Sequence, residues 1–125
     1  MTDFAAASDE FFRAYNDCDI DEVERRLAPD LDFAHHNRGF ATRDRGELIA
    51  VLRQFVATIM PDRKFSEPSR VTVSGNTVIR EATWSGHAKE DIPGFGTAGE
   101  FIELQLCSVL RFDDDGIIVE WKDYG

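Results

Sequence analysis

Three successive segments in the second half of the chain alternate between apolar and polar side chains, and this period of two constrains the fold most. Residues 77–87, 99–112 and 117–124 each place alternate side chains on opposite faces, as a β-strand does. A turn at Ser74-Gly75-Asn76 leads into the first segment from a short run at 70–73, and an acidic turn with a glycine joins the last two. The pattern predicts an antiparallel sheet with one apolar face.

The first half of the chain shows helical spacing instead, with an aspartate placed to cap each helix. The predicted elements are, in order, a helix over 3–17, a helix capped by Asp19 and stopped by Pro29, a strand over 31–37, and a helix capped by Asp44 and ended by Pro61. Helices followed by a run of strands indicate an α+β fold. We therefore expect one domain over 1–125, in which a curved, mostly antiparallel sheet wraps around about three helices.

Composition and charge narrow the classes of partner. The chain has 125 residues and a net charge of −10, and it contains ten phenylalanines and two tryptophans. Nucleic-acid binders normally present a basic face, so a nucleic-acid partner is not expected, and an anionic membrane is disfavoured for the same reason. The aromatic supply suits a large core or the walls of an apolar cavity.

Several features that would define other classes are missing from the sequence. Cys18 and Cys107 lie far apart and fit neither a disulfide framework nor a metal-binding spacing. No nucleotide-binding glycine loop is present. The N-terminus lacks the basic start of a signal peptide, and no apolar run approaches membrane-spanning length. We expect a cytoplasmic protein that uses no metal and no cofactor.

An apolar stripe on the last predicted strand ends in a carboxylate. Ile117, Val119, Trp121 and Asp123 share one face of this strand. An acid in this position either emerges into water at the end of the strand or is held in a pocket. In a dry pocket beside an indole ring, the pKa of the carboxyl group is raised towards that of a useful base.

The strand predicted over 31–37 has a similar arrangement, because His35 and Asn37 continue the face of Leu31 and Phe33. An imidazole exchanges protons near neutral pH, and an amide orients a carbonyl group or a water. The alternative is a buried histidine bonded to backbone, or a strand end that turns to solvent. Asp123, His35 and Asn37 are the predicted catalytic residues.

Other inward-facing side chains are candidates for the wall of a ligand pocket, or simply for the core. Arg80 is placed either to pair with a pocket acid or substrate anion, or to lie on the rim. Ser108 is either a ligand partner or a satisfied core hydroxyl. The loop at 93–96 is either a mobile flap with Phe95 at its tip or an ordinary connection. The predicted pocket residues are Trp121, Trp84, Tyr15, Phe33, Leu104, Leu106, Ser108 and Arg80.

Two stretches carry a family resemblance that spans the whole chain. The NTF2-like superfamily has a helix break that resembles Ala14-Tyr15-Asn16-Asp17-Cys18-Asp19-Ile20-Asp21. The final hairpin of that superfamily resembles Arg111-Phe112-Asp113-Asp114-Asp115-Gly116-Ile117-Ile118-Val119-Glu120-Trp121. The chain looks most like the SnoaL-like polyketide cyclases and the limonene-epoxide-hydrolase group. The resemblance implies a cone-shaped, cystatin-like α+β fold. It does not imply one reaction, because this superfamily hosts several enzymes and non-catalytic binding domains.

Epoxide hydrolysis by the mechanism of the limonene-epoxide-hydrolase group is not expected. Asn37 matches the asparagine that holds water in those enzymes, but His35 stands where they have a tyrosine. The last strand resembles their Trp-Arg-Asp-Tyr signature, which assigns Asp123 to a catalytic acid. Their arginine and second aspartate fall on Ala82 and Trp84 here, so the arrangement that activates water is incomplete.

The ketosteroid isomerases also differ from this chain, because their oxyanion donors fall on Phe11 and Ser108 and their base falls near His36 or Asn37. The SnoaL-like cyclases remain, since they resemble this chain in placing one aspartate, here Asp123, as a general acid or base in an apolar cavity.

We therefore expect cofactor-independent acid/base catalysis, of cyclase or isomerase type, on a small hydrophobic carbonyl compound. The alternatives are a module that binds a small hydrophobic ligand without changing it, and an interaction domain with a filled core. A homodimer is also expected, because the outer face of the strand at 99–112 carries Phe101, Cys107 and Val109 among polar residues.

Overall fold

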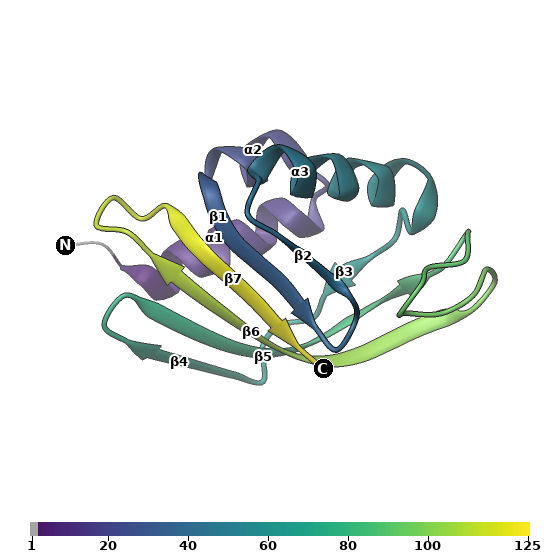
Figure 1. The fold of residues 1–125 in the computed structure, drawn as a ribbon. Coiled ribbons are helices and arrows are strands. Elements are labelled where there is room, and N and C mark those ends of the chain that lie inside the picture. Colours follow the sequence, from purple (N-terminus) through teal and green to yellow (C-terminus); the bar gives the residue numbers. More distant parts are fainter. Residues whose placement is uncertain (1–2) are drawn as a thin grey trace.

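The computed structural model describes residues 3–125 as helices packed over one face of a curved sheet (Figure 1). The helices are α1 (Phe4–Asn16), α2 (Ile20–Arg25) and α3 (Arg45–Gln54), and a π-helical turn, η1 (Phe55–Ile59), continues α3. The strands are β1 (Leu27–His36), β2 (Phe40–Thr42), β3 (Lys64–Phe65), β4 (Arg70–Ser74), β5 (Thr77–His87), β6 (Phe101–Phe112) and β7 (Ile118–Tyr124).

All seven strands belong to one sheet in the order β2-β1-β7-β6-β5-β3, with β4 also paired to β5. Every pairing is antiparallel except that of β1 with β7, which is parallel. The sheet curves without closing, and the helices fill its concave side (Figure 1). This arrangement confirms the predicted NTF2-like α+β cone. It also makes β7 a central strand, which lies between β1 and β6.

Each helix begins where the sequence places a capping aspartate. Asp3, Asp19 and Asp44 each accept a hydrogen bond from a backbone N–H in the first turn of the helix that follows. The end of the second helix differs from the prediction, because α2 stops at Arg25 and β1 begins before Pro29. Proline has no N–H to donate to a sheet, and the pairing of β1 with β7 shifts register between Leu27 and Asp32, where Pro29 lies.

A bulge in β7 corrects the predicted faces of the last strand. Phe112 pairs with Ile118, but Arg111 pairs with Glu120, so Val119 is an extra residue on β7. Ile118 is consequently buried, whereas Val119, predicted to face inward, is half-buried. Downstream of the bulge, Trp121 and Asp123 face inward as predicted.

The core is built from aromatic side chains that α1 packs against β7. Phe11 is fully buried and meets the indole ring of Trp121 edge-on, with 5.1 Å between ring centroids.

No helix in the described part of the chain is long and apolar enough to span a membrane. On the outer face of β6, Phe101 is 55% exposed, while Cys107 and Val109 are half-buried. The homodimer expected from this face stays a prediction.

We expect Phe11→Ala to lower the free energy of unfolding by about 3–5 kcal/mol, because it removes a buried ring beneath β7. The matched change Phe101→Ala removes an exposed ring and should alter that free energy by no more than about 0.5 kcal/mol. Urea denaturation followed by circular dichroism measures both. Equal losses in the two variants would contradict this description of the core.

Candidate functional site

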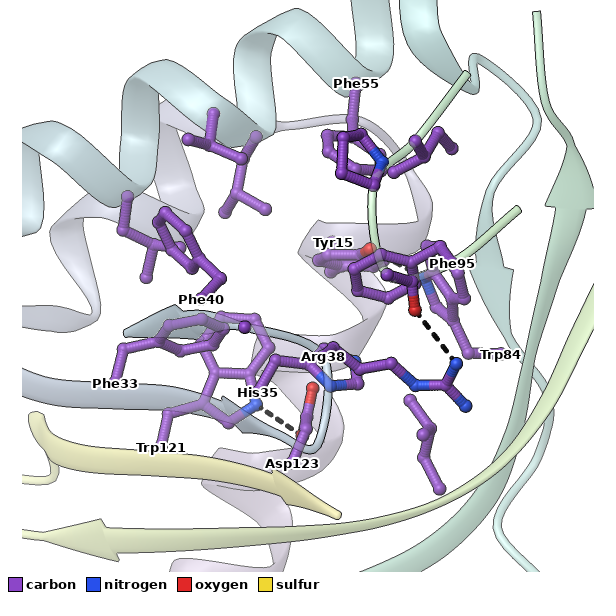
Figure 2. Close-up of a pocket in the computed structure, with 18 of the residues that line it drawn as sticks. Tyr15, Phe33, His35, Arg38, Phe40, Phe55, Trp84, Phe95, Trp121 and Asp123 are labelled. Atoms are coloured by element: carbon purple, nitrogen blue, oxygen red, sulfur yellow. Dashed lines mark hydrogen bonds between the residues drawn. The ribbon is translucent and has the colours of Figure 1, made fainter. Parts of the chain in front are cut away.

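A cavity of about 450 Å³ lies between α3 and the concave face of the sheet (Figure 2). Its wall on the helix side is apolar and includes Leu48, Val51 and Leu52. The loop after β5 closes one end, where the Lys89 N–H donates to the Ile59 carbonyl at 2.8 Å. The aromatic side chains of the wall are Tyr15, Phe33, Phe40, Phe55, Phe65, Trp84, Phe95 and Trp121.

Asp123 places a buried carboxyl group in this wall. Asp123 is only 3% exposed. Its Oδ1 accepts hydrogen bonds from the Ser108 hydroxyl at 2.6 Å and from the Trp121 Nε1–H at 2.9 Å. Burial raises the pKa of Asp123 to about 6, and the two hydrogen bonds oppose this rise. Within residues 3–125, both hydrogen bonds to the carboxylate end on Oδ1, which leaves Oδ2 for a molecule in the cavity.

His35 lies beside Asp123 on the neighbouring strand, and the two residues are paired in the β1–β7 register. Burial lowers the pKa of His35 to about 4, and the positive charge of Arg38 contributes to this shift. The imidazole is therefore neutral near neutral pH. Within residues 3–125 its Nδ1 is buried without a hydrogen-bond partner, and the ring meets Phe95 edge-on at 4.9 Å. A buried nitrogen without a partner is costly.

Tyr15 contributes a third polar group to the wall. It is 4% exposed, and its hydroxyl oxygen accepts a hydrogen bond from the Trp84 Nε1–H at 2.9 Å. Burial raises the pKa of Tyr15 to about 12, so the hydroxyl keeps its proton. Because the oxygen is already an acceptor, the O–H remains a donor. The sequence places Tyr15 in the pocket, but it gives no sign that an indole orients the hydroxyl.

Arg38 ties the rim of the cavity to the loop that carries Phe95. Its Nη1 donates to the Gly94 carbonyl at 3.0 Å, and its guanidinium carbon lies 5.6 Å from the centre of the Phe95 ring (Figure 2). Gly94 has a φ of +84°, and a Cβ there would collide with the backbone oxygen of Arg38. Phe95 thus forms part of the wall, between His35 and Trp84. Whether this loop moves as a flap stays a prediction.

Four residues predicted for the site do not line the cavity. Asn37 is exposed, because the chain turns there with a φ of +69°. Arg80 is buried, but its guanidinium binds Asp9 and the Ser8 hydroxyl under α1. Leu104 is half-buried and lies outside the wall, and Ser108 reaches the site only through its bond to Asp123.

The remaining predicted residues do come together. Asp123, His35, Tyr15, Phe33, Trp84, Leu106 and Trp121 all line the one cavity. Alternation along the strands predicted these positions, except that of Tyr15, which came from the helical spacing of α1. Arg38 was missed because it lies in a turn, where no period applies. Within residues 3–125, no three His, Cys, Asp or Glu side chains are grouped so that they could hold a metal ion.

The family profile described as SnoaL-like domain matches residues 9–121, and the chain therefore belongs to this family. No curated protein matches the chain. The identification is one of family and fold, and it agrees with the resemblance drawn from the sequence.

Several solved structures share the fold. A proposed polyketide cyclase from Pseudomonas putida KT2440 is similar with a TM-score of 0.84 and 17% identity, over 100% of this chain and 92% of that one. IdmH, a proposed polyketide cyclase from Streptomyces antibioticus, is similar with a TM-score of 0.77 and 21% identity, over 98% and 91%. An LEH-like epoxide hydrolase from M. tuberculosis is similar with a TM-score of 0.73 and 24% identity, over 95% and 79%. At these identities the likeness shows the fold alone.

The buried carboxyl group makes stability depend on pH in a predictable direction. The pKa of Asp123 in the folded protein, about 6, exceeds the ordinary value of 3.8, so the folded state favours the protonated carboxyl group. The stability that the protonated group contributes is lost as the pH rises through 6. Asp123→Asn has no such proton to lose. We expect the free energy of unfolding of the native protein, relative to that of Asp123→Asn, to fall by about 2 kcal/mol between pH 4 and pH 8.

Urea denaturation of both proteins across this pH range measures the difference. Since His35 titrates in both proteins, its opposite contribution largely cancels in the comparison. A difference that does not change with pH would show that burial does not disfavour the ionised carboxylate.

Proposed function

We propose that this protein is a cofactor-independent acid/base catalyst, of cyclase or isomerase type, that acts on a small hydrophobic carbonyl compound. The observation that carries the proposal is the state of Asp123. Its carboxyl group is buried in an apolar wall, and its pKa is raised to about 6. Among residues 3–125, both hydrogen bonds to this carboxyl group go to Oδ1, so Oδ2 is left for a ligand. A base is most effective when its pKa lies near the working pH, which holds for this carboxyl group.

In the proposed reaction, Asp123 removes a proton from the carbon next to a carbonyl group. The electrons of that C–H bond pass into the carbonyl, which becomes an enolate oxygen. Two neutral donors face the same cavity, the Tyr15 hydroxyl and an N–H of His35, and either can hydrogen-bond this oxygen. A neutral imidazole is suited to this role because it polarises the carbonyl without giving up a proton completely.

The enolate then has two outcomes. In an isomerisation, Asp123 returns the proton to a different carbon. In a cyclisation, the nucleophilic carbon attacks a second carbonyl of the same molecule, and the protonated carboxyl group of Asp123 supplies a proton to the new alkoxide. Both routes use one carboxyl group as base and then as acid, so neither requires a second acidic side chain in the wall.

The aromatic wall of the cavity favours the binding of a hydrophobic substrate. Tyr15, Phe33, Trp84 and Trp121 bring flat apolar surfaces to the cavity from α1, β1, β5 and β7. Such walls stack on planar rings and exclude water, and exclusion of water strengthens the hydrogen bonds to a developing oxyanion. The cavity volume of about 450 Å³ suits a molecule of a few fused rings.

A second function, a binding module that holds such a ligand without changing it, is favoured by one observation. Within residues 3–125, Asp123 is the only acidic side chain in the wall, so no separate acid and base are present. The two functions differ in whether the carbon-bound proton of a ligand exchanges. A further possibility, an interaction domain with a filled core, is disfavoured by the size of the cavity.

Deuterium exchange tests proton abstraction without knowledge of the natural substrate. Enolisable aromatic ketones, such as indanone and tetralone, are incubated with the protein in deuterium oxide, and exchange next to the carbonyl is followed by NMR. We expect Asp123→Asn to slow the catalysed exchange at least about 100-fold. Asp30→Asn changes an exposed aspartate on β1 and should leave the rate unchanged. Ketones that raise the melting temperature without exchanging would instead favour the binding module.

Tyr15→Phe tests the oxyanion donor in the same assay. Removing one preorganised hydrogen-bond donor should slow the exchange about 100-fold. The pH dependence of the exchange rate, which Asp123 sets, should stay the same. The control is Tyr124→Phe, which removes a hydroxyl from a residue that is 45% exposed at the end of β7. Equal rates for the Tyr15 variant and the native protein would remove Tyr15 from the mechanism.

A further inference from the structure

A second polar site lies behind the cavity, where the chain leaves α1. Arg63 is 1% exposed, so its guanidinium is held inside the protein. Its Nη2 donates to the Tyr15 carbonyl at 2.8 Å, and its guanidinium carbon lies 4.4 Å from the centre of the Tyr15 ring. Its Nε is one of the two buried side-chain polar atoms of the described residues that have no partner. A buried cation normally has a carboxylate partner, because an uncompensated buried charge is costly.

The side chain that Arg63 does meet is Cys18. Nη1 of Arg63 lies 3.2 Å from the Cys18 sulfur, and within residues 3–125 Arg63 has no ion pair with a carboxylate. The other buried arginine, Arg80, does have one, in Asp9. The thiolate is the form in which a cysteine reacts, and a cation in contact with the sulfur favours that form. Cys18 therefore stands where the buried charge requires a negative partner.

Cys18 also occupies an unusual backbone position. It follows α1 with a φ of +60°, and the Asp19 N–H returns to the Ala14 carbonyl at 3.0 Å, as in the helix endings where glycine usually supplies this conformation. The residue is half-buried, so it is not fully enclosed by the protein. Asp17 and Asp19 flank it, but both are exposed to water, which screens their charges more than that of the buried guanidinium.

We propose that Cys18 is a site of covalent modification, a thiol activated by Arg63 to react with electrophiles such as hydrogen peroxide. In that reaction the thiolate sulfur attacks one peroxide oxygen, an S–O bond forms, and the O–O bond breaks. The sulfur is oxidised by two electrons to a sulfenic acid, and the leaving hydroxide takes a proton from solvent to become water. The reaction does not involve Asp123, so the inference is independent of the proposed function.

Modification of Cys18 acts on the cavity through Arg63. An oxidised or alkylated sulfur changes the partner of Nη1, while the same guanidinium stacks on Tyr15 and bonds its carbonyl. Tyr15 lines the cavity and receives the hydrogen bond from Trp84. A change at the thiol therefore moves the wall that would contact a ligand.

The chain provides its own control thiol. Cys107 is half-buried on β6, where burial raises the pKa of its thiol and the nearby charge of Glu81 acts in the same direction. The variant Cys107→Ser carries only Cys18, and Cys18→Ser carries only Cys107. Alkylation of each by iodoacetamide, followed by mass spectrometry between pH 5 and pH 9, compares the two thiols in the folded protein.

We expect Cys18 to react at least about fivefold faster than Cys107 and than free glutathione at pH 7, because the Arg63 guanidinium is in contact with its sulfur. Arg63→Lys in the Cys107→Ser background should slow the reaction of Cys18, because the ammonium group cannot reproduce the fork of the guanidinium. If that variant does not fold, the rate of Cys107→Ser relative to glutathione alone decides. A Cys18 that reacts no faster than glutathione would overturn the proposal.

The link to the cavity is tested with the neutral fluorescent probe phenylnaphthylamine. Hydrogen peroxide treatment of Cys107→Ser should weaken binding of the probe several-fold, and dithiothreitol should restore it. The same treatment of Cys18→Ser should have no effect. Unchanged binding after confirmed oxidation of Cys18 would overturn the coupling to Tyr15.

Discussion

The hydrogen bonds that hold the Asp123 carboxyl group inside the sheet are the interaction on which the rest of the site depends. The Ser108 hydroxyl and the Trp121 Nε1–H both point to Oδ1. Without these donors, an acid 3% exposed among aromatic rings would lack any protein partner. With them, one oxygen is satisfied and the other is available. The bond from Trp121 also fixes the orientation of its indole ring, against which Phe11 and Phe33 pack edge-on.

Burial shifts the pKa values of three of the polar groups in the cavity wall in different directions. The pKa of Asp123 is raised to about 6, that of His35 is lowered to about 4, and that of Tyr15 is raised to about 12. Near neutral pH the cavity therefore contains one group that can change its charge easily and two neutral groups that can donate hydrogen bonds. When one environment moves the pKa values of neighbouring groups apart, these groups can take different roles in an acid/base reaction.

The two buried arginines show how α1 is connected to the rest of the protein. Arg80 lies under this helix and binds Asp9, so its charge is balanced by a carboxylate. Arg63 reaches the end of the helix and finds a thiol and a carbonyl instead. One arginine therefore anchors the helix, while the other couples Cys18 to Tyr15 and thus to the cavity wall.

The sequence by itself determined the order of the helices and the longer strands, the helix starts and the inward face of most strands, because these follow from local rules. It did not predict the short strands β2 and β3. A capping aspartate precedes each helix, and alternation placed Asp123, His35, Phe33 and Trp84 on faces that line one cavity. The family resemblance pointed to the same cone-shaped fold. None of these signals requires knowledge of which segments meet in space.

Only the tertiary structure decided which polar groups share the site. The bulge at Val119 reset the face of β7, and the turn at Asn37 carried that amide into solvent. Arg80 was drawn away by Asp9 on α1, and Arg38 reached the cavity rim by bonding Gly94, which is far from it in sequence. Long side chains take their partners from segments that the fold brings together, so their final positions depend on distant contacts that no local pattern records.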